Sequence, residues 1–427
     1  MGIKTLFRWT FILPAIFAFF LTPYPTRLGF YEFIFSFDQA SLGLLPAGFS
    51  KGEAQWGFTF EDLYGDGGHT DEESAKNYRN RLWGQTALVT GANSGVGYET
   101  ALALARLGAS VTMACRNPSR CEAAAKKIRE DEVVLQRAEK DRGIVDPESA
   151  SDIVTMMVDT SSLKSVQKFC REFLARTDDG EGSPKPLDML FLNAGIPFWG
   201  TLELTEDGIE KVFATNNVGH HLMYRLLEPS IFRSDELRTT PARIVHTSSA
   251  ASFATYHPYK VATDLETMKN EEQKGMGSYA PSKLAQILWA RELTAQLDAT
   301  TNSSEDNNVD PNSIVYVNAA HPGAVATNIF YSGPLGELPY GIGKALEKVW
   351  KEFVEKVMWT SEEGALTLVY LGTAVEDLQS KNIRGRYFHP QSIMIQDHPN
   401  ASDNDPGTKI LQEKLWAFMD ELVADFL

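Results

Sequence analysis

The sequence predicts a doubly wound α/β fold with a mostly parallel sheet of seven strands. From Thr86 onward, short apolar runs alternate with longer helical stretches. The runs are apolar at successive positions rather than at every second one, which is typical of strands covered by helices on both faces. A glycine-rich turn follows the first run and precedes a helical stretch. These observations favour one parallel sheet between two helical layers.

The expected strands are spread over about 300 residues of the chain. Six alternate with helices in one direction: TALVT (86–90), SVTMAC (110–115), IVTMMVD (153–159), DMLFLN (188–193), RIVHTSS (243–249) and IVYVNAA (314–320). A last run, GRYFHP (385–390), is expected to close the edge of the sheet. Polar inserts at 136–152, 177–186 and 298–312 are expected to be surface excursions rather than a second domain.

Charge and cysteine content exclude some classes of protein. The 427 residues include 40 Lys and Arg against 56 Asp and Glu, a net charge of −16. Such a balance argues against nucleic acid as a partner, because neutralising phosphates requires clustered basic residues. With only Cys115, Cys121 and Cys170, no disulfide framework is expected to hold the fold.

The N-terminus differs from the rest of the chain. Residues 1–31 carry three basic residues and no acidic one, and Trp9–Leu21 is uncharged and apolar. That run is short for a span and contains Pro14. We expect residues 1–49 to be a retained anchor with an interfacial part, 50–82 a connector and 83–427 the catalytic domain. A buried core helix and a cleaved targeting peptide are the alternatives. An anchor would associate the protein with a membrane, expected to be the endoplasmic reticulum, on a side that the sequence leaves open.

The glycine-rich turn indicates a dinucleotide site. Thr90 is followed by glycines at 91, 95 and 97, which permit a tight turn and a close approach of the backbone to a pyrophosphate. The next helix would add its free N–H groups and the positive end of its dipole. The residues expected to bind there are Gly91, Ser94, Gly95, Val96 and Gly97.

Two residues at the ends of later strands bear on the choice of cofactor. A site for NAD commonly has Asp or Glu at the end of the second strand, and this chain has Arg116 just after it. A guanidinium there favours NADP through bonds to the 2′-phosphate, although Arg116 could simply face solvent. Asp159 could accept from the adenine amino group, or it could cap the helix that begins near Ser162.

Tyr279 and Lys283 indicate the chemistry. Their spacing of four residues places the hydroxyl and the ammonium on one face of an expected amphipathic helix. A nearby ammonium favours the phenolate, so Lys283 is expected to lower the pKa of Tyr279 toward the working pH. A tyrosine tuned in this way can give or take a proton during hydride transfer.

With these motifs, residues 83–425 resemble the short-chain dehydrogenase/reductase family and its Rossmann fold. The resemblance is to the branch that is similar to retinol dehydrogenases and fungal membrane-linked oxidoreductases. It implies that Ser249 orients the substrate oxygen, with Ser248 as the alternative. It also implies that Asn216 holds a water in a relay to Lys283, unless Asn216 only fixes a helix kink. Tyr279 and Lys283 would lie at the nicotinamide, with Lys283 bonded to its ribose.

Two further segments match the same family. Leu192-Asn193-Ala194-Gly195 is similar to its Asn-Asn-Ala-Gly strand end, with Leu192 in place of the first Asn. By resemblance, Asn193 and Gly195 are cofactor residues. His321–Thr327 is similar to the segment that holds the nicotinamide carboxamide, which implies roles for Pro322, Val325 and Thr327. The family also implies homodimerisation.

The substrate region is expected between Thr327 and Glu362. Apolar residues recur there at spacings of three and four, which indicates either packing on the core or a lid that accepts an apolar substrate; they are Ile342, Leu346, Val349, Trp350, Phe353, Val354 and Val357. The sequence therefore predicts an NADP(H)-dependent oxidoreductase for an apolar ketone or aldehyde and its alcohol, without a metal. The alternatives are a catalytically silent dinucleotide-binding regulatory or scaffold protein, and a soluble secondary-metabolite reductase.

Overall fold

The sheet is the part of the molecule that places every other element. The computed structural model describes residues 60–65, 70–143, 152–176, 186–197, 201–233, 240–255, 260–270, 276–303, 314–323, 325, 359–395, 398, 400–402 and 404–427. Within them, eight strands form one sheet in the order β3-β2-β1-β4-β5-β6-β7-β8. The strands are β1 Thr86–Thr90, β2 Ser110–Cys115, β3 Ile153–Met157, β4 Met189–Leu192, β5 Ala242–Thr247, β6 Val315–Ala320, β7 Arg386–His389 and β8 Ile393–Ile395.

The predicted doubly wound fold is confirmed, with one additional strand. The contacts from β3 through to β7 are all parallel, and only β8 is antiparallel, pairing Phe388 with Met394. The run at 385–390 was expected to close the edge, but β8 lies outside it. Since β8 has three residues, it is too short for its periodicity to be seen in the sequence.

The continuous apolar character of the strands has a simple cause in the packing. Along β1, Leu88 belongs to the core on one face of the sheet, whereas Ala87 and Val89 belong to the core on the other. The same alternation occurs in β4, where Leu190 and Phe191 lie in opposite cores. Both faces are therefore buried, as predicted for strands enclosed by helices.

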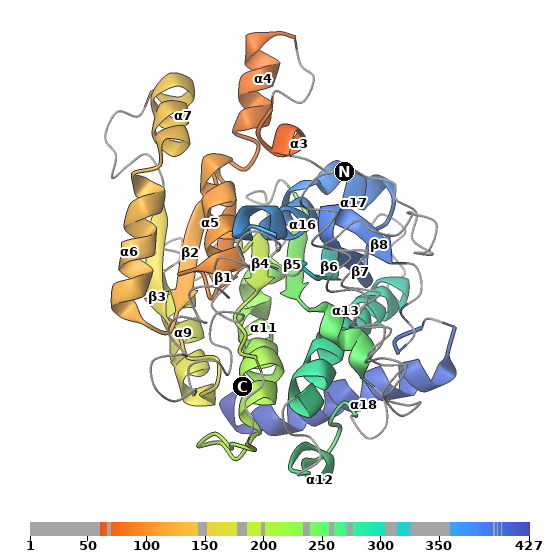
Figure 1. Ribbon diagram of the computed structural model, residues 1–427. Coiled ribbons are helices and arrows are strands. Elements are labelled where there is room, and N and C mark those ends of the chain that lie inside the picture. Colours follow the sequence, from red (N-terminus) through yellow and green to blue (C-terminus); the bar gives the residue numbers. More distant parts are fainter. Residues whose placement is uncertain are drawn as a thin grey trace, which may run out of the picture.

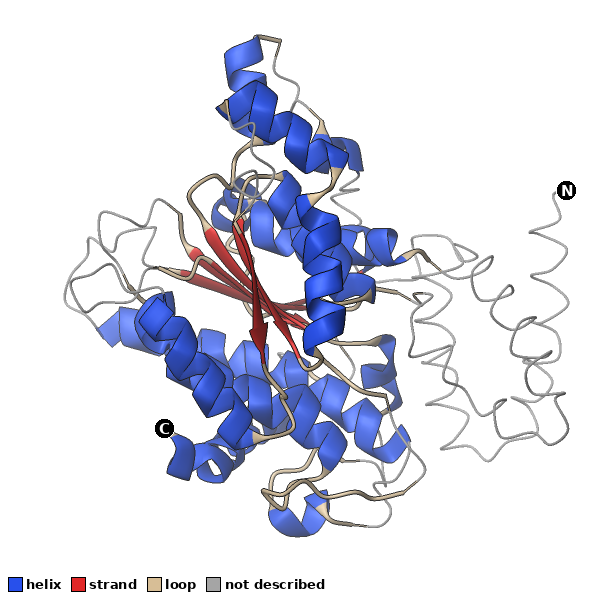
Figure 2. Ribbon diagram, turned by 90° about the vertical axis from the view of Figure 1, so that its left-hand side faces the viewer, coloured by secondary structure: helices blue, strands red, loops and turns tan. Residues whose placement is uncertain are grey.

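Helices cover both faces of the sheet, which Figure 2 shows between two helical layers. One layer contains α5 (Gly95–Arg106), α6 (Pro118–Arg129) and α16 (Ser361–Thr373). The other contains α9 (Leu163–Arg176), α11 (Gly219–Ile231) and α13 (Met276–Ser303), with α18 (Pro406–Val423) packed on α11 and α13 (Figure 1). Shorter elements connect them: α10 Lys211–Phe213, η1 Ala214–Val218, η2 Ala250–Ala254, α12 Leu265–Met268, α17 Val375–Ser380, η6 Pro390–Ser392 and η7 Ala424–Phe426.

The connector and the first polar insert contain more helix than the sequence suggested. Part of the connector forms α3 (Phe60–Tyr64) and α4 (Glu72–Arg79), and the insert begins inside α7 (Glu132–Arg142). Arg137 of α7 donates to the carbonyl oxygens of Tyr64 at 3.0 Å and Arg79 at 3.1 Å. One guanidinium thus ties α7 to the connector, a long-range contact that local sequence does not reveal.

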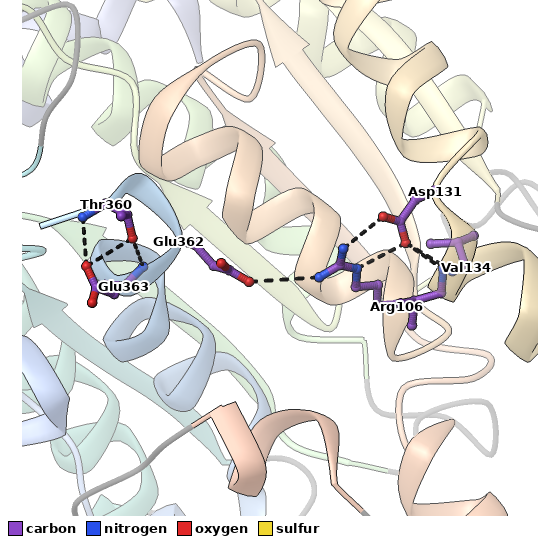
Figure 3. A network of polar contacts seen from close by, with 7 residues as sticks. Arg106, Asp131, Val134, Thr360, Glu362 and Glu363 are labelled. Carbon is purple, nitrogen blue, oxygen red and sulfur yellow. Dashed lines mark hydrogen bonds and ion pairs between the residues drawn. The ribbon is translucent and has the colours of Figure 1, made fainter. Parts of the chain in front are cut away.

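Arg106 joins three helices of the same layer (Figure 3). From the end of α5 it donates two hydrogen bonds to Asp131, at 3.0 and 2.8 Å, and lies 3.9 Å from Glu362 of α16. Asp131 also caps α7 by accepting from the N–H groups of Val133 and Val134. The bidentate geometry fixes α7 against α5.

The helix that carries Tyr279 is not amphipathic, contrary to the prediction. From Ala280 to Leu293 every side chain of α13 is buried. The cause is tertiary, because the helix contacts β5 and β6 on one side and α18 and η2 on others. The helix also continues to Ser303, so the third insert starts within it.

Two of the three cysteines form one local disulfide. Cys115 at the end of β2 and Cys121 in α6 form a disulfide, whereas Cys170 is free and buried. The bond spans only 6 residues, so it constrains one local turn and not the whole fold.

The predicted anchor, residues 1–49, lies outside the described part of the chain. Among the residues that are described, no helix is long and apolar enough to cross a bilayer.

Gly219 provides a test of how α11 packs against the segment that follows β3. A Cβ at this position of α11 would lie 1.9 Å from the carbonyl oxygen of Thr160, so the backbone would have to move. We expect Gly219→Ala to lower the free energy of unfolding by about 3 kcal/mol in urea titrations. The control is Gly407→Ala at the exposed start of α18, where a Cβ meets only the Asp405 side chain at 3.3 Å. Equal stability of the two variants would contradict this packing.

Candidate functional site

The glycine turn lies against the end of β4 without room for side chains. A Cβ on Gly91 would lie 3.0 Å from the Ala194 Cα, and one on Gly97 would lie 2.5 Å from the Gly91 oxygen. Gly91 and Gly95 also have φ of +68° and +60°, where glycine is favoured. Ser94 precedes α5 without capping it through its side chain, so the first N–H groups of the helix remain for an anion. This cradle fits a dinucleotide pyrophosphate.

The Thr90 hydroxyl connects the glycine turn to the segment that follows the neighbouring strand β4. Its oxygen accepts from the N–H groups of Asn193 at 2.8 Å and Ala194 at 2.9 Å. The Asn193 amide in turn donates to the Thr90 carbonyl at 2.9 Å. Asn193 is thus placed by backbone contacts beside the glycines, and Gly195 follows it in an exposed position.

Arg116 and Asp159 lie at the ends of neighbouring strands. Arg116 is exposed directly after β2, next to Asn117, which caps α6 by accepting from the Arg120 N–H at 2.9 Å. Asp159 accepts from both the N–H and the hydroxyl of Ser161, at 3.0 and 2.6 Å. It does not cap α9, because the N–H of Leu163 donates to Asp207 instead.

The segment expected to hold the carboxamide is described only in part. Val325 forms a parallel bridge with Trp359, whereas Thr327 and the apolar stretch 327–357 lie outside the described residues. Gly364, which the sequence did not single out, brings α16 against this segment. A Cβ there would lie 2.5 Å from Val325, 3.1 Å from the Pro322 oxygen and 3.3 Å from Val96.

The two candidate serines have different partners. The Ser248 hydroxyl donates to the Lys283 carbonyl at 2.7 Å and is buried. Ser249 follows the end of β5 and is partly exposed, and its side chain is hydrogen bonded to that of Tyr279. Ser249 is therefore the serine whose hydroxyl lies beside the phenol.

The pKa of Tyr279 differs from the expectation. Burial raises it above its ordinary value, and the hydrogen bond from Ser249 only partly offsets this effect. The Lys283 ammonium lies 5.5 Å from the centre of the Tyr279 ring, and it is not among the groups that shift the Tyr279 pKa. In this arrangement Lys283 does not supply the expected lowering.

Lys283 itself is deeply buried, with 5% of its surface exposed. Its ammonium donates to the Thr247 carbonyl at 2.9 Å and to the Gln286 side-chain oxygen at 3.2 Å. Burial lowers the pKa of Lys283 to about 7. An ammonium has three N–H donors, so one remains for a ligand hydroxyl.

Asn216 occupies a π-helical turn, η1, and is fully buried. Its side chain accepts from the Ile196 N–H at 2.9 Å and donates to the Ser282 hydroxyl at 3.0 Å. Ser282 then donates to the Tyr279 carbonyl at 2.7 Å. Asn216 therefore lies at a helix distortion and is also linked through Ser282 to the helix that carries Tyr279. π-helical turns often occur at functional sites.

His220 connects Asn216 with the glycine turn and was missed in the sequence. Burial lowers its pKa to about 3, so the ring is neutral. Its Nδ1 lies 3.2 Å from the Asn216 carbonyl, which can only accept, so Nδ1 carries the proton. Nε2 then accepts from the Thr90 hydroxyl at 3.0 Å. The only signal in the sequence is its position four residues after Asn216.

Comparisons with known proteins give similarities to one family. A profile of the family described as short chain dehydrogenase matches residues 85–261. Retinol dehydrogenase 14 of Homo sapiens is 35% identical over 309 residues, which cover 72% of this chain and 78% of the relative. The short-chain dehydrogenase TIC 32 A, chloroplastic, of Brassica napus is 31% identical over 338 residues, covering 79% and 88%.

A solved structure supports the fold independently. The crystal structure of an uncharacterized protein from Mycobacterium paratuberculosis has a TM-score of 0.51 and 24% identity, and it covers 80% of this chain and 94% of that one. At this level of identity the likeness bears on the fold alone.

The buried ammonium predicts a pH-dependent gain in stability. Because folding lowers the Lys283 pKa, Lys283 binds more protons in the unfolded chain from about pH 7 to 10, and its contribution to stability rises with pH there. Lys283→Met should therefore stabilise the cofactor-free protein more at about pH 6 than at about pH 9, by roughly 2 kcal/mol. Urea unfolding at both values measures this, with Lys126→Met at an exposed site as control. A gain that is the same at both pH values would contradict the buried charge.

Proposed function

The chain belongs to the short-chain dehydrogenase/reductase family, and from this premise we propose that it is an NADP(H)-dependent oxidoreductase of apolar ketones or aldehydes and their alcohols. The family to which its relatives belong comprises oxidoreductases, among them retinol dehydrogenases. The observation that carries the proposal is the meeting of Ser249, Tyr279 and Lys283 beside the end of β5, on the same edge of the sheet as the glycine turn.

The dinucleotide would lie across the carboxyl ends of the strands. Gly91, Gly95 and Gly97 with the start of α5 would hold the pyrophosphate, and Arg116 the 2′-phosphate. Asn193, Gly195, Pro322, Val325 and Thr327 are the proposed lining of the nicotinamide side. When bound, the cofactor supplies or accepts the hydride.

Ser249, Tyr279 and Lys283 would orient the substrate, transfer the proton and position the cofactor. The Ser249 hydroxyl donates to the substrate oxygen and orients it toward Tyr279. The Tyr279 hydroxyl gives its proton to that oxygen in reduction and takes it back in oxidation. The free N–H of Lys283 bonds the ribose, which fixes the cofactor relative to Tyr279.

The raised pKa of Tyr279 favours reduction at neutral pH. A phenol with a raised pKa stays protonated there, so the proton donor for a carbonyl is present in nearly every molecule. Oxidation requires the phenolate, so its rate should increase with pH over the range in which reduction remains constant.

The apolar substrate and the membrane are linked parts of the proposal. Residues 1–49 would anchor the protein at a membrane, expected to be the endoplasmic reticulum, and 327–357 would form an apolar lid over the substrate. The name of the human relative, a retinol dehydrogenase, agrees with a lipophilic alcohol. Residues 83–427 would act as one catalytic domain, with homodimerisation as the family implies.

Replacement of Tyr279 by phenylalanine separates catalysis from a silent binding role. We expect Tyr279→Phe to lower kcat by about 10²–10⁴-fold, because the proton donor is lost, while NADPH affinity changes little. Turnover of a panel of apolar carbonyls and fluorescence titration of NADPH measure both. Tyr316→Phe, in the core of the opposite face, should keep full activity. Full turnover by Tyr279→Phe would refute the mechanism and favour a regulatory protein.

Arg116 tests the choice of cofactor. Arg116→Ala should weaken NADPH binding by about 10–100-fold, since charge-assisted bonds to the 2′-phosphate are lost. NADH binding should be nearly unchanged, and Arg171→Ala on the exposed side of α9 serves as control. An equal loss of affinity for both cofactors would contradict a role at the 2′-phosphate.

A further inference from the structure

Gln286 lies one turn after Lys283 on α13. Its side-chain amide makes hydrogen bonds to both Lys283 and Asn216. The amide nitrogen donates to the Asn216 carbonyl at 3.0 Å, and the amide oxygen accepts from the Lys283 ammonium at 3.2 Å. The side chain is fully buried. A primary amide is suited to this bridge because it carries a donor and an acceptor on one rigid group.

The main-chain carbonyl of Asn216 lies in a π-helical turn. In η1 the N–H of Gly219 bonds to Ala214, five residues earlier. The main-chain oxygen of Asn216 accepts from two side chains, Gln286 and His220. The distorted turn thus provides the acceptor to which Gln286 is fastened.

We propose that Gln286 is a positioning residue that holds the Lys283 ammonium in its working place by bridging it to the π-helical turn. The proposal rests on the proposed function, in which Lys283 fixes the cofactor beside Tyr279. A direct bridge through Gln286 thereby joins Asn216 to Lys283, a connection for which the resemblance implied a water.

The surroundings of Lys283 explain why such a bridge matters. The titratable groups that face it are Tyr279 on its own helix, His220 of α11, His246 of β5 and His321 after β6. Burial lowers the pKa of all three imidazoles, so they are neutral at pH 7. Among the described residues, no carboxylate forms an ion pair with Lys283.

The charge therefore depends on neutral acceptors. Thr247 and Gln286 provide the two hydrogen bonds that the ammonium makes, and each favours its protonated form. Removing the Gln286 oxygen should leave a less stabilised and less constrained ammonium. A glutamine that only filled space would have neither effect.

Two variants of similar volume separate the two halves of the bridge. Gln286→Met removes donor and acceptor, whereas Gln286→Glu keeps the acceptor for Lys283 and loses the donor to Asn216. The readout is the NMR titration of lysine side chains in isotope-labelled full-length protein, in which Lys283→Met identifies the resonance. This measurement requires no turnover. The matched control is Gln296→Met, since Gln296 lies on the same helix and bonds Glu292 at 2.9 Å.

We expect the Lys283 titration midpoint to fall by about one pH unit in Gln286→Met and to rise in Gln286→Glu, with no change in Gln296→Met. At about pH 7, Gln286→Met should also lose roughly tenfold in kcat with little change in the KM of the carbonyl. If Gln286→Met does not fold, the midpoint in Gln286→Glu decides alone.

The outcomes distinguish this inference from the proposed function. An unchanged Lys283 midpoint in folded variants that turn over normally would overturn the role of Gln286 and leave the reaction intact. A shifted midpoint together with a wild-type protein that reduces no carbonyl would support the bridge to Lys283 and overturn the reaction.

Discussion

A buried ammonium is the constraint on which the site depends. Burial lowers the pKa of Lys283 to about 7, and the nearby groups accept from its ammonium or leave it room. The end of β5 contributes the Thr247 carbonyl, and Ser248 holds the backbone of the same lysine. Gly195 has no side chain, and a Cβ there would lie 3.6 Å from the ammonium and 3.2 Å from Asn216. The groups at this edge of the sheet therefore surround the Lys283 ammonium as a shell.

This shell also connects parts of the chain that are distant in sequence. The main-chain carbonyl of Asn216 accepts hydrogen bonds from Gln286 of α13 and His220 of α11. The other ring nitrogen of His220 is hydrogen bonded to the Thr90 hydroxyl at the glycine turn. The proposed proton donor and the proposed cofactor cradle thus share one hydrogen-bonded framework. Because these hydrogen-bonded residues are buried, we expect a substitution at one of them to alter the hydrogen bonds of the others.

The sequence was sufficient where local rules decide the structure. Glycine at 91 and 97 is required by close backbone contacts, and the apolar runs are buried on both faces, so the turn and β1 to β7 could be predicted. It was insufficient where distant packing decides. The burial of α13 from Ala280 to Leu293 and the Gln286 bridge depend on neighbours far along the chain, and the Cys115–Cys121 bond depends on side-chain rotamers. The strand β8 is too short to show a periodicity. The lowered pKa expected for Tyr279 was wrong because the spacing of two residues does not reveal the burial that raises it.

The central claim is that this site transfers hydride between NADP(H) and an apolar alcohol or carbonyl. The most direct test is a turnover screen of the purified full chain against retinoid, sterol, fatty aldehyde and polyketide carbonyls, with NADPH and NADH side by side. The account predicts that at least one apolar carbonyl is reduced to its alcohol, and faster with NADPH. Tight NADPH binding without turnover of any substrate in either direction would contradict it.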